Sequence, residues 1–250
     1  MRITRRLLAF AAVLVLPLAA SAQQLTVSAA ASLTDAFKEL GPRFEQMKPG
    51  STVRFNFAAS GVLLQQISQG APVDIFASAD QETMNRAVEQ KNVDTDSRVN
   101  FASNTLVLIE PAQGGPGLKS LQDLSGPAVK RIAVGKVATV PVGRYTQQAL
   151  TAANLWTPLE PKFVQADSVR QVLDYVARGE ADAGFVYRTD AAIMGDKVKI
   201  VLTPSGNAPV TYPVAVVSDS RQKALARDFV AFLSSDAAQQ VLGRYGFGRP

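Results

Sequence analysis

The amino-acid sequence contains no cysteine and no histidine among its 250 residues. Without cysteine the chain forms no disulfide, and without either residue it lacks the ligands of the usual protein zinc sites. Catalytic groups of the Ser-His-Asp or Cys-His kind are excluded for the same reason. A phosphate-binding loop with Gly-Lys-Ser or Gly-Lys-Thr is also missing. Nothing here indicates an enzyme, and we expect no cofactor and no resident metal.

Long apolar runs are scarce, and the one near the start of the chain, Leu7–Ala20, has only 14 residues. A membrane-spanning helix needs roughly 20. Three arginines precede this run within the first six residues, and the small residues Ala20-Ser21-Ala22 end it. This order is typical of a secretory signal peptide. We therefore predict that residues 1–22 are a signal peptide cleaved after Ala22, and that the protein is periplasmic.

The rest of the chain lacks an excess of either charge. The sequence pI of about 9.6 depends partly on the three arginines of the predicted signal peptide, and without them 23 basic residues face 21 acidic ones. No basic run with interleaved aromatic residues occurs. Binding to nucleic acid is therefore not expected. The 228 residues that remain are enough for two lobes of about 100 residues each.

What the sequence does contain is an alternation of short apolar runs and segments with helical spacing. Strands are expected at 25–30, 52–58, 72–78, 101–110, 131–135, 162–165, 183–187, 197–202 and 212–217, and longer helices at 32–47, 62–69, 81–90, 142–153, 169–178 and 222–242. This order predicts an α/β protein with two lobes, each a mainly parallel sheet flanked by helices. We assign residues 23–102 and 207–250 to the first lobe and residues 103–206 to the second, with the strand at 101–110 crossing between them.

Four of the predicted strands end in small or hydroxyl residues that begin a helix. The junctions are Ser28–Ser32, Phe57–Gly61, Val140–Gly143 and Gln165–Val169. A helix N-terminus presents unpaired N–H groups and the positive end of the helix dipole, which favour an anion. Two junctions come from each predicted lobe, and ligands of such folds bind at the carboxyl ends of strands. The pattern predicts a small anion held by neutral donors in the cleft between the lobes.

The same residues leave other functions open. Arg144 and Arg170 lie near two of the junctions, and an arginine is the usual partner of a bound carboxylate. A receptor for sulfate, a small carboxylate or an amino acid is therefore an alternative. The run from Ser220 to Lys223 has the Ser-x-x-Lys spacing of serine acyl enzymes, so an exported hydrolase is a second alternative, although the accompanying motifs are missing. An N-cap is the simpler interpretation of Ser220.

Six segments, taken in order, resemble the bacterial periplasmic molybdate-binding proteins of ABC transporters. They are Thr26–Thr34, Gly70–Gln81, Val140–Tyr145, Asp167–Arg170, Tyr212–Val217 and Arg244–Phe247. The resemblance implies a two-lobed solute-binding protein of type II that closes around one tetrahedral oxyanion. It implies high-affinity binding of molybdate, and of tungstate, with delivery to a membrane permease. We expect the protein to act as a monomer.

The resemblance also implies which residues hold the anion. The hydroxyl groups would be those of Ser32, Ser60 and Tyr187, and the backbone amides those of Val142 and Val169. Relatives often carry alanine in place of Val142, whose larger side chain is expected to narrow the pocket. The only metal in such a site would be the molybdenum of the oxyanion itself.

A pocket that offers only donors also discriminates between anions. Hydrogen phosphate carries a proton that needs an acceptor, whereas molybdate, tungstate and sulfate carry none near neutral pH. We therefore expect phosphate to be rejected, provided that the carboxylate of Asp167 points away from the anion.

Overall fold

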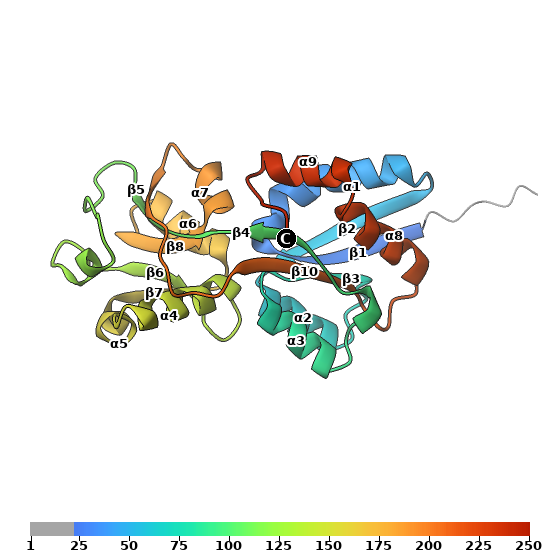
Figure 1. The fold of residues 1–250 in the computed structure, drawn as a ribbon, viewed down its shortest axis with the longest axis horizontal. Coiled ribbons are helices and arrows are strands. Elements are labelled where there is room, and N and C mark those ends of the chain that lie inside the picture. Colours follow the sequence, from blue (N-terminus) through green and yellow to red (C-terminus); the bar gives the residue numbers. More distant parts are fainter. Residues whose placement is uncertain (1–22) are drawn as a thin grey trace, which may run out of the picture.

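The computed structural model describes residues 23–250, which form two α/β lobes side by side, each built on a five-stranded sheet (Figure 1). The predicted signal peptide, residues 1–22, lies outside the described residues. Within residues 23–250, no helix combines the length and the hydropathy needed to cross a bilayer.

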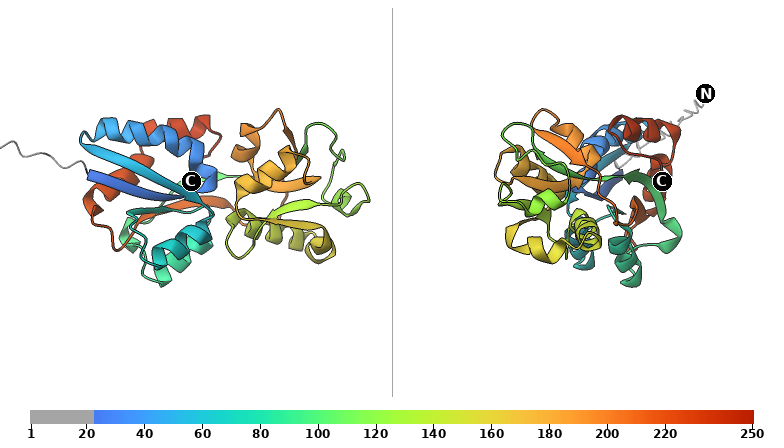
Figure 2. Two further views of the ribbon diagram at one scale, coloured as in Figure 1. Left: turned by 180° about the vertical axis from the view of Figure 1, so that it is seen from behind. Right: turned by 60° about the vertical axis from the view of Figure 1, so that its left-hand side comes forward.

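The sheet of the first lobe has the strand order β2-β1-β3-β10-β4. Its strands are β1 (Gln23–Ala30), β2 (Ser51–Ala58), β3 (Ile75–Ala77), β4 (Val99–Asn104) and β10 (Val210–Val216). One face is covered by α1 (Thr34–Met47), α8 (Lys223–Leu233) and α9 (Asp236–Arg244), and the other by α2 (Ser60–Ser68) and α3 (Gln81–Glu89) (Figure 2). Short 3-10 helices, Ala31–Leu33 and Thr95–Ser97, precede α1 and β4. The covering helices are amphipathic: α1 buries Phe37, Leu40 and Phe44, at helical spacing.

The sheet of the second lobe has the same arrangement, in the order β7-β6-β8-β5-β9. Its strands are β5 (Leu106–Pro111), β6 (Ile132–Gly135), β7 (Phe163–Ala166), β8 (Ala183–Tyr187) and β9 (Val198–Leu202). The helices around it are α4 (Pro141–Ala152), α5 (Trp156–Leu159), α6 (Val169–Ala177) and α7 (Arg188–Ile193), with α4 and α6 on opposite faces (Figure 1). Two short 3-10 helices, Gln122–Ser125 and Glu160–Lys162, lie in the connections.

The predicted two-lobed α/β architecture is confirmed, and the sheets are mixed, because two of the four strand pairings in each sheet are antiparallel. In the first lobe β10 runs antiparallel to both β3 and β4, and in the second β5 runs antiparallel to both β8 and β9. The parallel pairs, β1 with β2 and β3, and β6 with β7 and β8, are joined through helices. Strands β10 and β5 enter their sheets from the other lobe instead, so no crossover helix fixes their direction.

The segment predicted as one strand from 101 to 110 is two strands that belong to different sheets. The break is at Thr105, whose N–H is bound by the side-chain oxygen of Asn104 at 2.8 Å instead of by a neighbouring strand. The C-terminal helical segment is likewise divided, because the Ser235 side chain caps a new helix by accepting the Ala238 N–H. The chain thus crosses between the lobes at residues 104–106 and returns before β10.

Candidate functional site

The structure brings all five sequence-predicted site residues to one small pocket between the two sheets. Its empty volume, which includes open solvent, is about 200 Å³. Besides those five, the lining residues are small or apolar: Ala30, Ala31, Ala58, Ala59, Ala79, Val140 and Pro141. Among residues 23–250, no charged side chain lines this pocket. It is suited to a compact, polar ligand.

The first lobe contributes the two serine hydroxyls. Ser32 is separated from the end of β1 by one residue, Ala31, and Ser60, which begins α2, is separated from the end of β2 by one residue, Ala59. Because these parallel strands pair in register up to Ala30 and Ala58, the two serines lie at the same edge of the sheet. Both side chains are buried. The oxygen of Ser60 accepts the N–H of Ala79 at 3.0 Å, which leaves its own hydrogen to be donated.

The second lobe contributes two helix N-termini. Val142 lies in the first turn of α4, after Pro141 at the start of the helix, and Val169 is the first residue of α6. N–H groups of a first turn have no acceptor within the helix. The Ser168 side chain caps α6 by accepting the Gln171 N–H at 3.2 Å, and so does not occupy the amide of Val169. Both first turns line the pocket.

Tyr187 ends β8 and is fully buried, yet its hydroxyl has no hydrogen-bond partner among residues 23–250. Burial raises the pKa of Tyr187 well above its ordinary value, so the phenol keeps its hydrogen. A buried hydroxyl without a partner is costly, and most buried polar groups are paired. Because Tyr187 lines the pocket, an acceptor atom of a ligand there would satisfy it.

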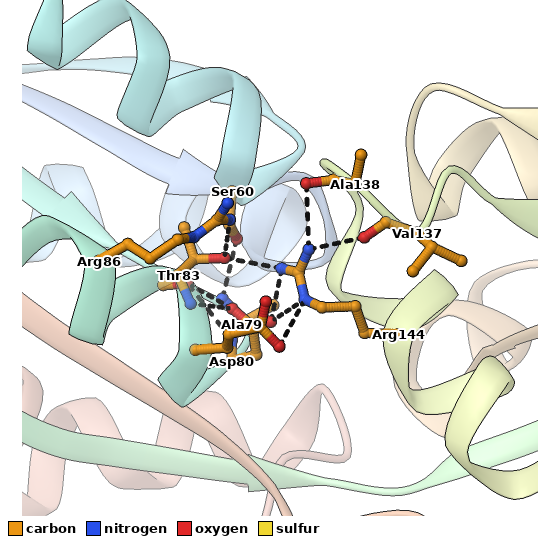
Figure 3. A network of polar contacts seen from close by, with 10 residues as sticks. Ser60, Ala79, Asp80, Thr83, Arg86, Val137, Ala138 and Arg144 are labelled. Atoms are coloured by element: carbon orange, nitrogen blue, oxygen red, sulfur yellow. Dashed lines mark hydrogen bonds and ion pairs between the residues drawn. The ribbon is translucent and has the colours of Figure 1, made fainter.

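The two arginines near the junctions are bound elsewhere. Arg144 donates to Asp80 and Thr83 of the first lobe and to the backbone oxygen of Val137 (Figure 3). Arg170 forms ion pairs with Asp35 and Asp190. Neither arginine lines the pocket, which lacks the two-pronged donor that a carboxylate receptor normally uses.

The remaining acidic and nucleophilic candidates have structural contacts. Asp167 is outside the pocket and pairs with Lys136 at 2.5 Å, which meets the condition for excluding phosphate. Ser220 donates to Asp74 at 2.6 Å and accepts the Gln222 N–H. The N-cap of α8 is Gln222, so the interpretation of Ser220 as an N-cap was wrong. Within residues 23–250 no group of three or more acidic side chains could hold a metal ion.

Two polar residues behind Ser32 were missed by the sequence reasoning. The hydroxyl of Tyr212 lies 3.0 Å from the oxygen of Ser32, and the side-chain amide of Asn104 lies 3.2 Å from the hydroxyl of Tyr212. Both residues sit in strands that pair with each other, β10 and β4. Asn104 lies in no motif, and Tyr212, although it begins one of the six segments of the resemblance, was given no role at the site. Only the pairing of distant strands shows their place behind Ser32.

The chain matches the family of bacterial extracellular solute-binding proteins over residues 25–248. A molybdate-binding protein of Haemophilus influenzae is 37% identical over 238 residues, 91% of this chain and 91% of the relative. One of Escherichia coli is 38% identical over 232 residues, 90% of this chain and 88% of the relative. Among solved structures, the periplasmic molybdate-binding protein of Azotobacter vinelandii has a TM-score of 0.78 at 27% identity, covering 90% of this chain and 99% of its own. The protein therefore belongs to the bacterial extracellular solute-binding proteins, in the family of these molybdate-binding relatives.

Proposed function

We propose that this protein binds molybdate, and also tungstate, and delivers it to the permease of an ABC transporter. The family consists of binding proteins, so the chain is not an enzyme, and molybdate is its ligand rather than a cofactor. The proposed ligand-binding residues are Ser32, Ser60, Val142, Val169 and Tyr187. The observation that carries the proposal is the buried, unpaired hydroxyl of Tyr187 in a pocket lined by neutral residues.

The pocket compensates a buried anion without a counter-charge. Removing a doubly charged ion from water is very costly unless hydrogen bonds replace its hydration. Hydroxyl and amide donors give charge-assisted bonds to the oxyanion, and the N-termini of α2, α4 and α6 add their dipoles. Since every group offered is a donor, the arrangement favours an anion without hydrogens and disfavours hydrogen phosphate.

The remaining features of the proposal concern the setting of the protein. We propose export to the periplasm with cleavage after Ala22, and action as a monomer. The proposed lobes are residues 23–102 with 207–250, and residues 103–206. In this arrangement the lobes close over the anion, and reopening at the permease releases it.

Calorimetric titration of the mature protein with molybdate, tungstate, sulfate, phosphate and glutamate tests the proposal. We expect one-to-one binding of molybdate and tungstate and none of phosphate or glutamate. Ser32→Ala, Ser60→Ala and Tyr187→Phe should each weaken molybdate binding by about 1.5–3 kcal/mol, roughly ten- to a hundredfold. Ser205→Ala, at an exposed position outside the pocket, is the matched control. Unchanged titrations in all three variants would refute the assignment of the site.

A further inference from the structure

A chain of hydrogen bonds leads from the backbone between the lobes to the hydroxyl of Ser32. Thr105 N–H donates to Asn104 Oδ1 at 2.8 Å, and Asn104 Nδ2 lies 3.2 Å from Tyr212 Oη. Tyr212 Oη in turn lies 3.0 Å from Ser32 Oγ. Tyr212 is fully buried and Ser32 nearly so, at 0% and 3% exposure. Within the described chain, these contacts determine the hydrogen-bond partners of Asn104, Tyr212 and Ser32.

The direction of each hydrogen bond follows from the first one. The backbone N–H of Thr105 can only donate, so the oxygen of the Asn104 amide must face it and the nitrogen must face the other way. That nitrogen lies 2.9 Å from Thr189 Oγ1 and 3.2 Å from Tyr212 Oη, two atoms that can accept its hydrogens. Tyr212 Oη therefore accepts from Asn104.

The direction of the Asn104–Tyr212 hydrogen bond determines the direction of the next one, between Tyr212 and Ser32 at the pocket. With an acceptor position of Tyr212 occupied, its hydrogen is satisfied when it is donated to Ser32 Oγ, its other polar neighbour in the structure. Ser32 Oγ is then an acceptor for Tyr212, and the hydrogen of Ser32 is directed to a different acceptor. Since Ser32 lines the pocket, that acceptor is an oxygen of the bound anion.

We propose that Tyr212 and Asn104 are positioning residues that fix Ser32 as a hydrogen-bond donor and thereby set the preference of the pocket for anions without hydrogens. The inference rests on the proposed function and adds the residues that determine its selectivity. Ser60 is held as a donor in the same way by a backbone group, the N–H of Ala79, which every substitution at position 79 except proline would keep. Ser32 is fixed by side chains, so substitution can change its hydrogen-bonding direction.

Tyr212→Phe tests the inference, because it removes the hydroxyl and keeps the ring that packs against Phe101, Tyr187 and Phe247. In the variant Ser32 Oγ is free to rotate and to accept a hydrogen from the ligand. We expect molybdate to bind about tenfold more weakly, because the Ser32 hydroxyl is no longer oriented toward the anion. A tenfold loss corresponds to the net free energy of about one hydrogen bond. Hydrogen phosphate should gain, so that the ratio of the phosphate Kd to the molybdate Kd falls by roughly tenfold or more.

Two further variants separate positioning from a structural role. Ser32→Ala removes the donor and the acceptor together, so it should weaken molybdate without any gain for phosphate. Tyr175→Phe, in α6 of the second lobe and outside the pocket, is the control for loss of a tyrosine hydroxyl. Competition titrations at pH 8, with thermal unfolding to show that each variant is folded, give the two dissociation constants.

The outcomes distinguish this inference from the proposed function. If the wild-type protein binds no oxyanion, the proposed function fails. If it binds molybdate, and Tyr212→Phe changes the molybdate and phosphate constants by the same factor or changes neither, the function stands and the positioning role is overturned.

Discussion

The guanidinium of Arg144 lies 2.5 Å from the carboxylate of Asp80, although the two residues belong to different lobes. Both side chains are buried, at 8% and 5% exposure. Asp80 also caps α3 by accepting the Thr83 N–H at 3.1 Å, and Thr83 Oγ1 accepts from Arg144 at 2.7 Å. Ala79, the residue before Asp80, binds Ser60 in the pocket. The ion pair thus links the lobes directly beside the proposed anion site (Figure 3).

Arg144→Met should weaken molybdate binding. The substitution leaves Asp80 buried and unpaired when the lobes are closed, which costs about 3–5 kcal/mol for such pairs, whereas opening exposes the carboxylate to water. The cost falls on the closed, ligand-bound form, so the molybdate Kd should rise by roughly two to four powers of ten. Calorimetric titration measures the affinity, and small-angle scattering should show a more open protein.

Arg227→Met is the matched control for that variant. Arg227 pairs with Asp94 and Asp96 at the surface of the first lobe, and its side chain is 45% exposed. Exposed ion pairs contribute little, and this one does not join the lobes. An equal loss of affinity in both variants would show that Arg144 acts through general charge and not through closure.

Gly61→Ala should prevent complete closure. Gly61, in α2 of the first lobe, donates its N–H to the backbone oxygen of Thr139 in the second lobe at 2.9 Å. A methyl group at position 61 would lie 2.7 Å from that oxygen and 2.8 Å from the Cα of Thr139, both backbone atoms. Such overpacking typically costs about 1–3 kcal/mol, which predicts a roughly five- to hundredfold loss of molybdate affinity.

The stability of the ligand-free protein separates closure from folding in that test. Within the first lobe the new methyl group meets no such contact, so unfolding without molybdate should stay close to that of the wild type. Gly243→Ala, in α9 with no atom near the added methyl group, should leave binding unchanged and stabilise the helix slightly. Wild-type affinity in Gly61→Ala would contradict the role assigned to this contact.

The position of the candidate site was predictable because it depends on strand-to-helix junctions, which local sequence specifies, whereas the residues proposed to bind the anion came from the family resemblance. Ser32 and Ser60 each lie two positions after the last residue of a predicted strand. The ends of β1 and β2 meet because these strands are parallel neighbours. Tyr187 is different: its strand was predicted, but the following helix α7 was not. That helix has only six residues, and its start is set by Asp190, which accepts the Tyr187 N–H at 3.3 Å.

What could not be predicted depends on contacts between distant segments. Arg144 and Arg170 were candidates for binding a ligand carboxylate. Only the folded chain shows that Asp80 and Asp35 are positioned to pair with them. Antiparallel β10 and β5 were missed for the same reason, since strand direction there is set by the passage between lobes and not by a local connection. The hydrophobic period and the secondary-structure propensity of the sequence show neither the partners of these arginines nor the direction of these two strands.

Asp190 should make stability fall as the pH rises from about 4 to 6. Its carboxyl group is fully buried, and burial raises its pKa from 3.8 to about 6, although the neighbouring Arg170 opposes the shift. In this interval the folded protein retains a proton that the unfolded chain has already released, so raising the pH favours unfolding as far as this group is concerned. Above the folded-state pKa both forms are ionised and the effect is constant.

Asp190→Asn removes this titration while keeping an oxygen that can accept the Tyr187 N–H. Urea unfolding of wild type and variant, measured between pH 4 and 8, gives the difference in unfolding free energy, wild type minus variant. We expect this difference to decrease as the pH rises to about 6 and to level off above it. Asp196→Asn, at an exposed position, is the control for loss of a carboxylate. A difference that increases with pH would mean that Arg170 outweighs burial and holds Asp190 ionised throughout, as an ordinary ion pair would.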